Sequence, residues 1–301
     1  MVHALIDLLS KPEFLWRPRQ LLRSRRFEPC DTLQHLPLPW DCTIFARSTE
    51  VVGRLIATLG LYDLPLTEAI MRLAVAGDTA LDIGANIGYT ALVFARSVRA
   101  EGSVRAFEPN RFVLPTLRKN VSEWSSLRIA PIEVETIALS DRDGEAILGF
   151  PDGYADNEGI ASLELSKDGI PVSVRRLESF DFGDVGIMKI DVEGHEAAVL
   201  CGATGLLQRK AIRDILFEEH GVYPARSHQI LLDHGYSIFR VTGSRFGPLL
   251  LPPQAEARQP FLPPEYPPNY LATIDPSRAK ARFKVRGWQA LSPGLRKYPN
   301  M

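Results

Sequence analysis

The sequence predicts an α/β protein built on a doubly wound, mostly parallel β-sheet. Between residues 78 and 241, short apolar segments typical of buried strands alternate with segments of helical periodicity. A glycine-containing turn follows the first of these strands and opens the first helix, as in sheets covered by helices on both faces. We therefore predict a core at residues 73–243, an N-terminal helical lead-in at 1–72 and a Pro-rich C-terminal extension at 244–301.

Apolar periodicity also predicts the individual elements of the core. Strands are expected at residues 79–83, 104–108, 132–139, 186–190, 214–217 and 236–241. Helices are expected at residues 89–98, 111–121, 193–200 and 228–234. Between residues 141 and 180, short strand-like segments around Gly and Asp predict an inserted β-structure on the carboxyl side of the sheet.

The flanking regions differ in composition from the core. Residues 1–30 alternate apolar and basic positions, which indicates either helices that touch anionic lipid or helices packed on the core with a solvated basic face. Helices are expected at 50–59 and 65–76, each followed by a glycine. Three proline pairs after residue 244 argue against a long helix or a central strand. This segment is expected to be an extended arm, with 270–274 as an edge strand, or a disordered tail.

Composition narrows the class of protein. The chain has 301 residues, of which 45% are hydrophobic, enough for one large core. Its formal net charge of -1 gives no overall field toward nucleic acid or a membrane. The cysteines Cys30, Cys42 and Cys201 form neither a metal-site nor a disulfide pattern, which predicts a reducing, cytoplasmic location. The sequence shows no signal-peptide pattern and no apolar run near the roughly 20 residues of a membrane span.

The most informative segment is residues 81–90, Leu-Asp-Ile-Gly-Ala-Asn-Ile-Gly-Tyr-Thr. Gly84 and Gly88 permit a tight turn and a close approach of the backbone to a bound cofactor. The pattern is Asp-x-Gly-x-x-x-Gly rather than the Gly-x-Gly-x-x-Gly of dinucleotide sites. Asp82, at the strand tip, would repel a diphosphate but accept hydrogen bonds from an ammonium or a hydroxyl. The loop thus predicts a Rossmann-like site for S-adenosylmethionine, which has no phosphate.

An acidic residue at the end of the second strand supports this prediction. Glu108 lies 20 residues after Gly88, where a carboxylate can accept from both hydroxyls of a ribose. The alternative is a solvent-facing strand end. Asn110 follows closely and can cap the next helix. A glycine loop and a strand-end acid in this order indicate a nucleoside-binding site.

A second polar segment, Lys-Ile-Asp-Val-Glu-Gly-His-Glu, spans residues 189–196. Ligands of open α/β sheets bind beyond the carboxyl ends of the strands, which is where these residues are expected. A methyl acceptor with a hydroxyl group must lose a proton, so a base is needed. Asp191 is our first candidate, and His195, Glu219 and His220 are alternates.

Other interpretations of this segment stay open. Mg²⁺ could be held by Asp191, Glu193 and Glu219, because it prefers oxygen ligands. A purely structural role is the alternative: Lys189 would pair with Glu218, while Glu193 and Glu196 would cap a helix.

Together these motifs resemble the FkbM family of methyltransferases over roughly residues 50–241. The resemblance rests on segments 60–63, 82–88, 107–109 and 138–141, and above all on Lys-Ile-Asp-Val-Glu-Gly at 189–194. It implies a class I methyltransferase fold, whose seven-stranded sheet has one antiparallel strand, and S-adenosylmethionine as methyl donor. By position, it implies that the cofactor is lined by Asp82, Gly84, Asn86, Glu108, Asn110 and Asp141. The Pro-rich extension departs most from the family, and His195 stands where many members have a small or apolar residue.

The predicted function is O-methylation of a hydroxyl on a small-molecule partner, such as a sugar, a glycoside or another natural product. One alternative is an NAD(P)-dependent oxidoreductase, but its Gly-x-Gly-x-x-Gly signature is absent. Another is a non-catalytic, methyltransferase-like binding module. Nucleic-acid methylation would call for a basic groove or an Asn-Pro-Pro-Tyr motif, and neither is evident. The sequence motifs do not identify the methyl acceptor or the oligomeric state.

Overall fold

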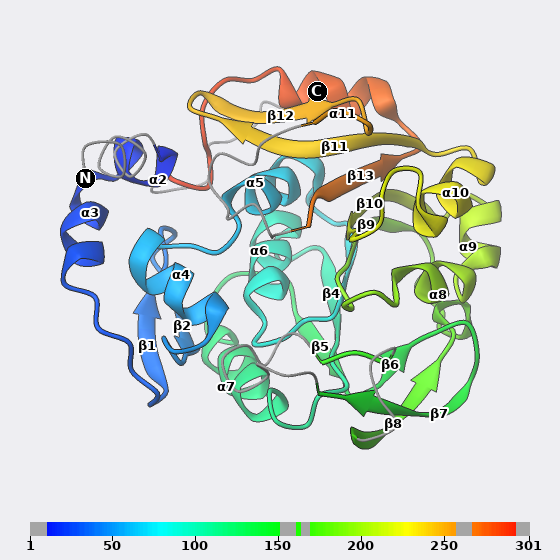
Figure 1. The fold of residues 1–301 in the computed structure, drawn as a ribbon, viewed down its shortest axis with the longest axis horizontal. Coiled ribbons are helices and arrows are strands. Elements are labelled where there is room, and N and C mark those ends of the chain that lie inside the picture. Colours follow the sequence, from blue (N-terminus) through cyan, green and yellow to red (C-terminus); the bar gives the residue numbers. More distant parts are fainter. Residues whose placement is uncertain (1–10, 151–160, 164–168, 257–266, 293–301) are drawn as a thin grey trace.

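The computed structural model describes residues 11–150, 161–163, 169–256 and 267–292. Its largest sheet has eight strands in the order β12-β11-β13-β10-β9-β3-β4-β5 (Figure 1). In chain order these are β3 (Thr79–Ile83), β4 (Ser103–Phe107), β5 (Ile132–Glu135), β9 (Val185–Ile190), β10 (Ile212–Glu218), β11 (Ser237–Ser244), β12 (Gly247–Leu251) and β13 (Asn269–Thr273). Only β13 and β12 run against the other strands. The predicted mostly parallel α/β sheet is confirmed.

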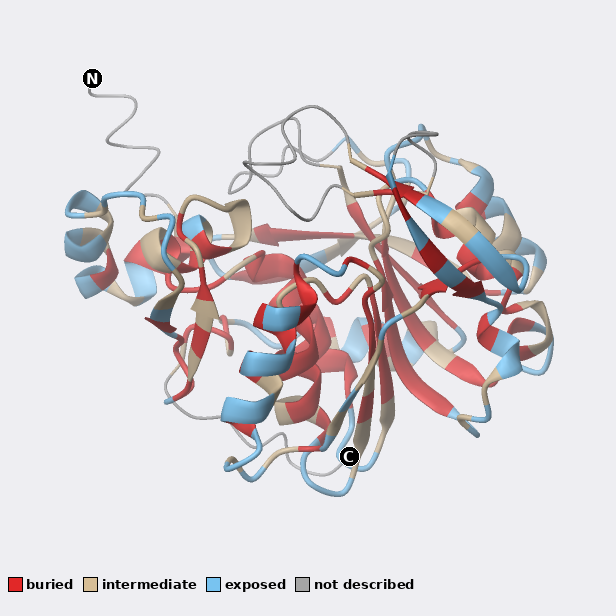
Figure 2. Ribbon diagram, turned by 90° about the horizontal axis from the view of Figure 1, so that it is seen from below, coloured by how far each residue is buried: buried red, intermediate tan, exposed pale blue. Residues whose placement is uncertain are grey.

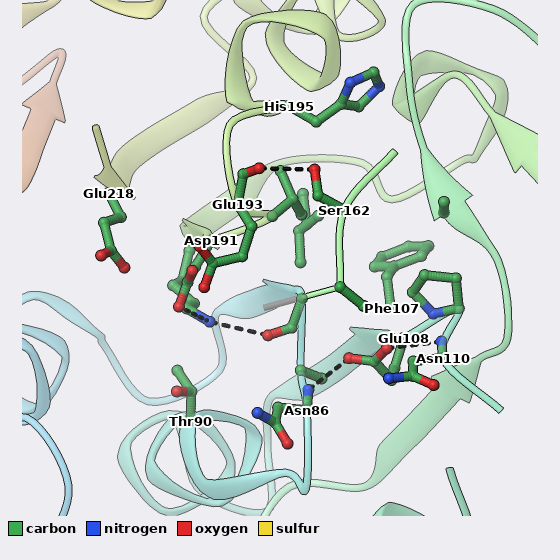
Figure 3. A pocket seen from close by; sticks show the side chains of 18 of the residues that line it. Asn86, Thr90, Phe107, Glu108, Asn110, Ser162, Asp191, Glu193, His195 and Glu218 are labelled. Atoms are coloured by element: carbon green, nitrogen blue, oxygen red, sulfur yellow. Dashed lines mark hydrogen bonds and ion pairs between the residues drawn. The ribbon is translucent and has the colours of Figure 1, made fainter. Parts of the chain in front are cut away.

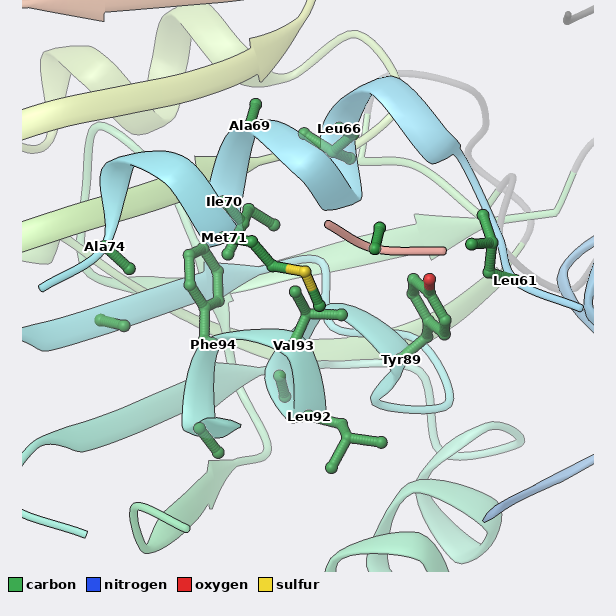
Figure 4. Packing of buried hydrophobic residues seen from close by; sticks show 14 of the residues in the cluster. Leu61, Leu66, Ala69, Ile70, Met71, Ala74, Tyr89, Leu92, Val93 and Phe94 are labelled. Carbon is green, nitrogen blue, oxygen red and sulfur yellow. The ribbon is translucent and has the colours of Figure 1, made fainter. Parts of the chain in front are cut away.

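Helices cover both faces of this sheet, and Figure 2 shows the strands largely buried between them. One face carries α4 (Val51–Leu59), α5 (Leu64–Leu73), α6 (Tyr89–Val98), α7 (Leu114–Trp124) and α11 (Pro276–Phe283). The other carries α8 (Glu196–Cys201), α9 (Thr204–Gln208) and α10 (Arg226–Asp233). Successive strand residues alternate between the two cores, so that Ala80 packs with the first set and Leu81 with the second. In Figure 4, Ile70 and Met71 of α5 pack against Val93 and Phe94 of α6.

A separate three-stranded sheet in the order β6-β8-β7 forms in the region of the predicted β-insertion. Its strands are β6 (Ala138–Leu139), β7 (Gly144–Gly149) and β8 (Gly169–Arg175), and the short 3₁₀-helix η3 (Leu177–Ser179) follows. The single strand predicted at 132–139 is therefore two strands, because the chain leaves the main sheet after β5 and enters the small sheet at β6. Ser162 forms an isolated bridge with Gly149 of β7. Its Oγ donates to the carbonyl oxygen of Glu193 at 2.7 Å, which joins the insertion to the loop after β9.

The lead-in contains more β-structure than predicted. After α2 (Pro12–Trp16) and α3 (Pro18–Arg25), a hairpin forms from β1 (Gln34–Pro37) and β2 (Thr43–Ala46). The helix α3 is anchored on α4 by Gln20, whose amide donates to the carbonyl oxygens of Ala57 and Thr58 at 3.2 and 3.0 Å. These two carbonyls belong to the last turn of α4, which lacks donors of its own. In the described residues, none of the helices is long and apolar enough to cross a membrane.

The expectation for the Pro-rich extension is wrong in one respect. Strand β13 is not at the edge of the sheet but lies between β10 and β11, and all five of its residues are buried. The prolines that argued against a central strand end at Pro268, immediately before β13, so the ladder N–H groups of the strand are intact. The sheet thus takes a central strand from beyond residue 243, and the division of the chain at that position stays a prediction.

A buried ion pair fastens the segment after β13 to α5. Arg72 Nε donates to Glu68 Oε1 at 2.7 Å, and both side chains are fully buried. The Arg72 guanidinium also donates to the carbonyl oxygens of Arg282, Val285 and Gly287 at 2.8, 2.6 and 2.7 Å. Glu68 Oε2 accepts from the backbone N–H of residue 290 at 2.8 Å. The pair satisfies backbone groups of a chain segment more than 200 residues away.

Candidate functional site

A cavity of about 460 Å³ lies at the carboxyl ends of β3, β4, β9 and β10. Its lining includes the loops that follow these strands, residues 161–163 of the insertion, Tyr62 of the lead-in and Pro267. In Figure 3, Glu218, Asp191 and Glu193 stand on one side of this cavity, and Glu108 with Asn86 and Asn110 on the other. The two polar segments singled out in the sequence therefore face one another across one space.

The glycine loop between β3 and α6 owes its glycines to contacts within the protein. Gly84 has φ +79°, and a Cβ there would lie 1.8 Å from the carbonyl oxygen of Asp191. Gly88 has φ +92°, and a Cβ there would lie 2.7 Å from Leu117 Cδ1. Side chains are excluded at both positions by the neighbouring loop and helix. Gly84 lines the cavity with its backbone, whereas Gly88 is not among the lining residues.

Glu108 holds the loop and the second strand end together. Its Oε2 accepts from Asn86 N and its Oε1 from Asn110 N, both at 2.8 Å. Burial raises the pKa of Glu108 to about 7, although these two donors favour the charged form. A carboxylate offers about four acceptor positions, so two bonds leave capacity for hydroxyl groups in the cavity. Asn110 also accepts from Phe112 N at 3.1 Å, ahead of α7.

Lys189 sits at the floor of the site, surrounded by acceptors. Its Nζ lies 3.1 Å from Asp191 Oδ2, 3.0 Å from Gly84 O and 3.7 Å from Asp82 Oδ1. Register explains the arrangement, because Lys189 pairs with Asp82 across β9 and β3. Burial alone would lower the pKa of Lys189, but Asp191 and Asp82 raise it above its ordinary value. The ammonium is therefore charged, and its ion-pair partner in the cavity is Asp191. It is not Glu218, the partner considered in the structural alternative.

Two further carboxyl groups reach the cavity near Asp191. Burial, Asp191 and Glu196 raise the pKa of Glu193 to about 8, and Glu193 Oε2 lies 3.6 Å from His220 Nε2. Burial, Asp191 and Glu193 raise the pKa of Glu218 well above its ordinary value. Within the described residues, the Glu218 carboxylate makes no hydrogen bond or ion pair, so its oxygens are open to a ligand. Two carboxyl groups that resist ionisation thus share one wall of the site.

Glu196 and His195 contact parts of the protein itself. Glu196 Oε1 accepts from Val192 N and Gly194 N at 3.1 and 3.2 Å, which is the structural role considered for it. Burial raises the pKa of Glu196 to about 7. His195 lines the cavity, and its Nε2 lies 2.9 Å from Ser140 Oγ.

Besides Gly88, three predicted residues do not line the cavity. Asp82 is fully buried beneath it, next to Lys189. Asp141 is exposed and lies 3.8 Å from Arg142, with Ser140 Oγ donating to it at 3.3 Å. Glu219 points toward the start of α10, where its carboxylate accepts from Gly221 N at 2.8 Å and from Ser227 Oγ. The carboxylates of Asp141 and Glu219 therefore interact with groups outside the cavity.

The suggested magnesium set is not assembled. Glu219 faces away from Asp191 and Glu193, so the three carboxylates do not converge. Across the described ranges, no group of three or more His, Cys, Asp or Glu side chains is arranged to hold a metal ion. The Mg²⁺ hypothesis is therefore not supported by this arrangement of side chains.

Glu218 is a cavity residue that the sequence analysis considered only as a structural partner of Lys189. Leu216 pairs with Lys189 in the parallel β10–β9 ladder. Side chains two residues further along, Glu218 and Asp191, therefore leave the sheet on the same face. The alternation of side chains along a strand was a signal in the sequence, because Glu219, one residue after Glu218, has to face the other side of the sheet.

Comparison with known proteins agrees with this geometry. Residues 82–238 match the family described as "Methyltransferase FkbM domain". The chain belongs to the FkbM methyltransferase family. This is a family of S-adenosylmethionine-dependent methyltransferases, so the oxidoreductase alternative is set aside. The architecture is that of the class I methyltransferase fold, with strand β12 added at one edge.

Two characterised relatives are similar at the same level. The 31-O-demethyl-FK506 methyltransferase FkbM of Streptomyces tacrolimicus is 29% identical over 197 residues, covering 54% of this chain and 74% of that protein. The hexuronic acid methyltransferase AglP of Haloferax volcanii is 29% identical over 180 residues, covering 59% of this chain and 70% of that protein. A crystal structure of methyltransferase FkbM from Methylobacillus flagellatus KT aligns with a TM-score of 0.43 and 14% identity, covering 66% of this chain and 44% of that chain.

Proposed function

We propose that this FkbM-family methyltransferase methylates a hydroxyl group of a small acceptor, such as a sugar, a glycoside or another natural product. The observation that carries the proposal is that one cavity holds both a carboxylate suited to a ribose and, opposite it, two carboxyl groups of raised pKa. Glu108 lines one side, and Glu193 and Glu218 line the other. Both relatives named above are methyltransferases, and one acts on a hexuronic acid.

The cavity suits S-adenosylmethionine in its polar and apolar parts. We propose that Glu108 accepts from the ribose hydroxyls and that the backbone at Gly84 and Asn86 borders the amino-acid end, with Asn110 nearby. Apolar side chains that can contact an adenine ring line the same side, namely Phe107, Ile137, Leu139 and Leu148. Asp82 would support the loop from below through Lys189. When bound, the cofactor supplies a methyl group that is already activated.

The protein's own contribution is then to position the acceptor and to remove its proton. Alignment of reacting groups contributes on the order of 7–11 kcal/mol in favourable cases. Asp191, our first candidate for the base, is already engaged by the Lys189 ammonium at 3.1 Å, so we assign it to positioning. We propose that Glu218 accepts the acceptor proton, because its oxygens are unengaged and burial favours its protonated form. Glu193 and His220 lie on the same wall and can bind the acceptor.

The test of this function has two steps. The purified chain is first titrated calorimetrically with S-adenosylhomocysteine and, separately, with NAD. It is then incubated with labelled S-adenosylmethionine and a panel of sugars, glycosides and polyketides. We expect binding of S-adenosylhomocysteine only, followed by transfer of label to a hydroxyl oxygen. Binding without transfer to any hydroxyl would instead favour the non-catalytic module. A small-molecule rather than nucleic-acid acceptor and a cytoplasmic location stay predictions.

Glu108→Gln is expected to weaken binding of S-adenosylhomocysteine by about 10- to 100-fold. Hydrogen bonds to a charged group are worth about 1.5–3 kcal/mol, and the amide presents a donor where the ribose needs an acceptor. Calorimetry measures the change. Glu133→Gln is the control, because Glu133 is on the neighbouring strand β5, is exposed and does not line the cavity. Equal affinities of the two variants would remove Glu108 from the cofactor site.

The rate of methyl transfer is expected to fall as the pH is lowered, over a range well above the pKa of an ordinary glutamate. Burial together with neighbouring carboxylates raises the pKa of Glu193 to about 8 and shifts that of Glu218 in the same direction. The base is active only when deprotonated, so activity is lost as the pH falls below this range. Glu193→Gln removes a negative neighbour and should move the profile to lower pH. A profile that is flat across this range would contradict the assignment.

A further inference from the structure

Three segments that are far apart in the sequence meet at one corner of the molecule. Figure 1 shows α2, the turn between β11 and β12, and the segment after α11 lying side by side there. Gly287 N donates to Phe246 O at 2.7 Å, which joins the last two segments. A Cβ on Gly287 would lie 3.3 Å from Trp16 Cη2, so α2 touches the same point.

Large apolar side chains are exposed at this corner. Phe246 is 73% exposed, Leu15 52%, Val285 48% and Trp16 45%. Single exposed hydrophobic residues are ordinary on a protein surface, but a group contributed by three segments marks a site of interaction. We call Leu15, Trp16, Phe246 and Val285, with the basic residues described next, the corner patch.

The corner patch is surrounded by cations. Arg19, Arg245, Lys284 and Arg286 are exposed and lie within three residues of its apolar members. In the described part of the chain, none of these four side chains forms an ion pair. Segments 15–19, 244–248 and 284–288 contain no Asp or Glu. Because the chain as a whole has a net charge of -1, this concentration of positive charge is local.

We propose that the corner patch binds the surface of an anionic lipid bilayer. Aromatic and aliphatic side chains partition into the boundary between headgroups and acyl chains, and Arg and Lys bind the acidic headgroups beside them. An acidic polymer would use the cations but leave Phe246 and Leu15 in water. An apolar protein groove would bury the hydrophobic side chains but leave the charges without partners. An anionic bilayer offers both acidic headgroups for the basic residues and an apolar interior for the hydrophobic side chains. The proposal does not depend on the acceptor proposed above.

The experiment is flotation of the full chain with lipid vesicles. Vesicles of phosphatidylcholine with phosphatidylglycerol are compared with vesicles of phosphatidylcholine alone, at low and high salt. We expect binding to the anionic vesicles, little binding to the neutral ones and weaker binding at high salt, because salt screens the headgroup charge. Failure of the unaltered chain to bind anionic vesicles, or equal binding to both kinds, would overturn the proposal.

Two variants separate the contributions, and both leave the cavity untouched. Phe246→Ser tests the apolar part, and Arg245→Glu/Arg286→Glu tests the charge. The charge reversal is expected to lower the partition coefficient by about tenfold or more, since each basic residue near an anionic surface contributes. Arg118→Glu/Arg209→Glu is the matched control, because both residues are exposed and lie outside the corner patch.

Unchanged binding by both corner-patch variants would refute the assignment of the surface. A change of oligomeric state in Phe246→Ser, without any vesicle binding by the unaltered chain, would show that the patch joins two copies of the protein and would equally overturn the proposal. Circular dichroism before and after each substitution verifies that the fold is kept.

Discussion

Glu218→Gln is expected to lower the rate constant of methyl transfer by about 10²–10⁴-fold, the usual contribution of a general base. The amide keeps the shape of the side chain but cannot take a proton from an acceptor hydroxyl. Glu218 lines the cavity beside Asp191 and Glu193, and within the described residues nothing else occupies its oxygens. Single-turnover transfer of label from S-adenosylmethionine to the acceptor found in the panel measures the effect.

The adjacent residue provides the control for this substitution. Glu219→Gln changes the same chemical group one position along the chain, where the side chain accepts from Ser227 and Gly221 outside the cavity. Its transfer rate should stay within a few-fold of the unaltered chain. Affinity for S-adenosylhomocysteine should be unchanged in both variants, because neither residue is assigned to the cofactor. If Glu218→Gln transfers at the normal rate while Asp191→Asn or His220→Gln does not, the proton acceptor is one of those residues.

Arg72→Met is expected to destabilise the protein by about 3–5 kcal/mol, the range found when one partner of a buried ion pair is removed. The substitution leaves the Glu68 carboxylate in a fully buried position without its guanidinium partner. It also removes the donors for the carbonyl oxygens of Arg282, Val285 and Gly287. Urea unfolding followed by circular dichroism gives the change in the free energy of unfolding.

The double variant Arg72→Met/Glu68→Leu separates two effects on stability: the loss of the ion pair itself, and the cost of leaving the Glu68 carboxylate buried without a partner. Replacing both members of a buried pair with apolar residues is often close to neutral. We expect the double variant to recover part of the stability, but not all, because the carbonyl oxygens that Arg72 served still lack donors. A single variant as stable as the unaltered chain would show that the segment after β13 is held mainly by apolar contacts such as those of Phe283 and Trp288.

Local signals in the sequence predicted the first half of the core closely. Strand β3 and helix α6 begin and end where expected, because a turn with two required glycines separates an apolar run from a run of helical period. The start of α7 was predicted three residues early. Asn110 does accept a backbone N–H, but regular helix begins only at Leu114. Boundaries of this kind depend on the geometry of one turn rather than on periodicity.

Features that depend on contacts between distant segments were less predictable. The position of β13 follows from pairing with β10 and β11, and its own five residues give no indication of which strands they join. The exchange of Glu219 for Glu218 has the same origin, since the register of β10 against β9 decides which carboxylate faces the cavity. By contrast, Glu108, Asn86 and Asp191 were identified from the sequence as candidates and line one cavity.

The order of strands also bears on how the polypeptide is made. Strand β13 is synthesised after every other strand of the large sheet, yet its slot is bounded on both sides by β10 and β11. Until β13 has emerged from the ribosome, β10 and β11 each present an unpaired edge of N–H and C=O groups. Unpaired strand edges of this kind pair with other chains. A nascent chain of this protein is therefore most exposed to aggregation after β10 and β11 have been made and before β13 pairs with them.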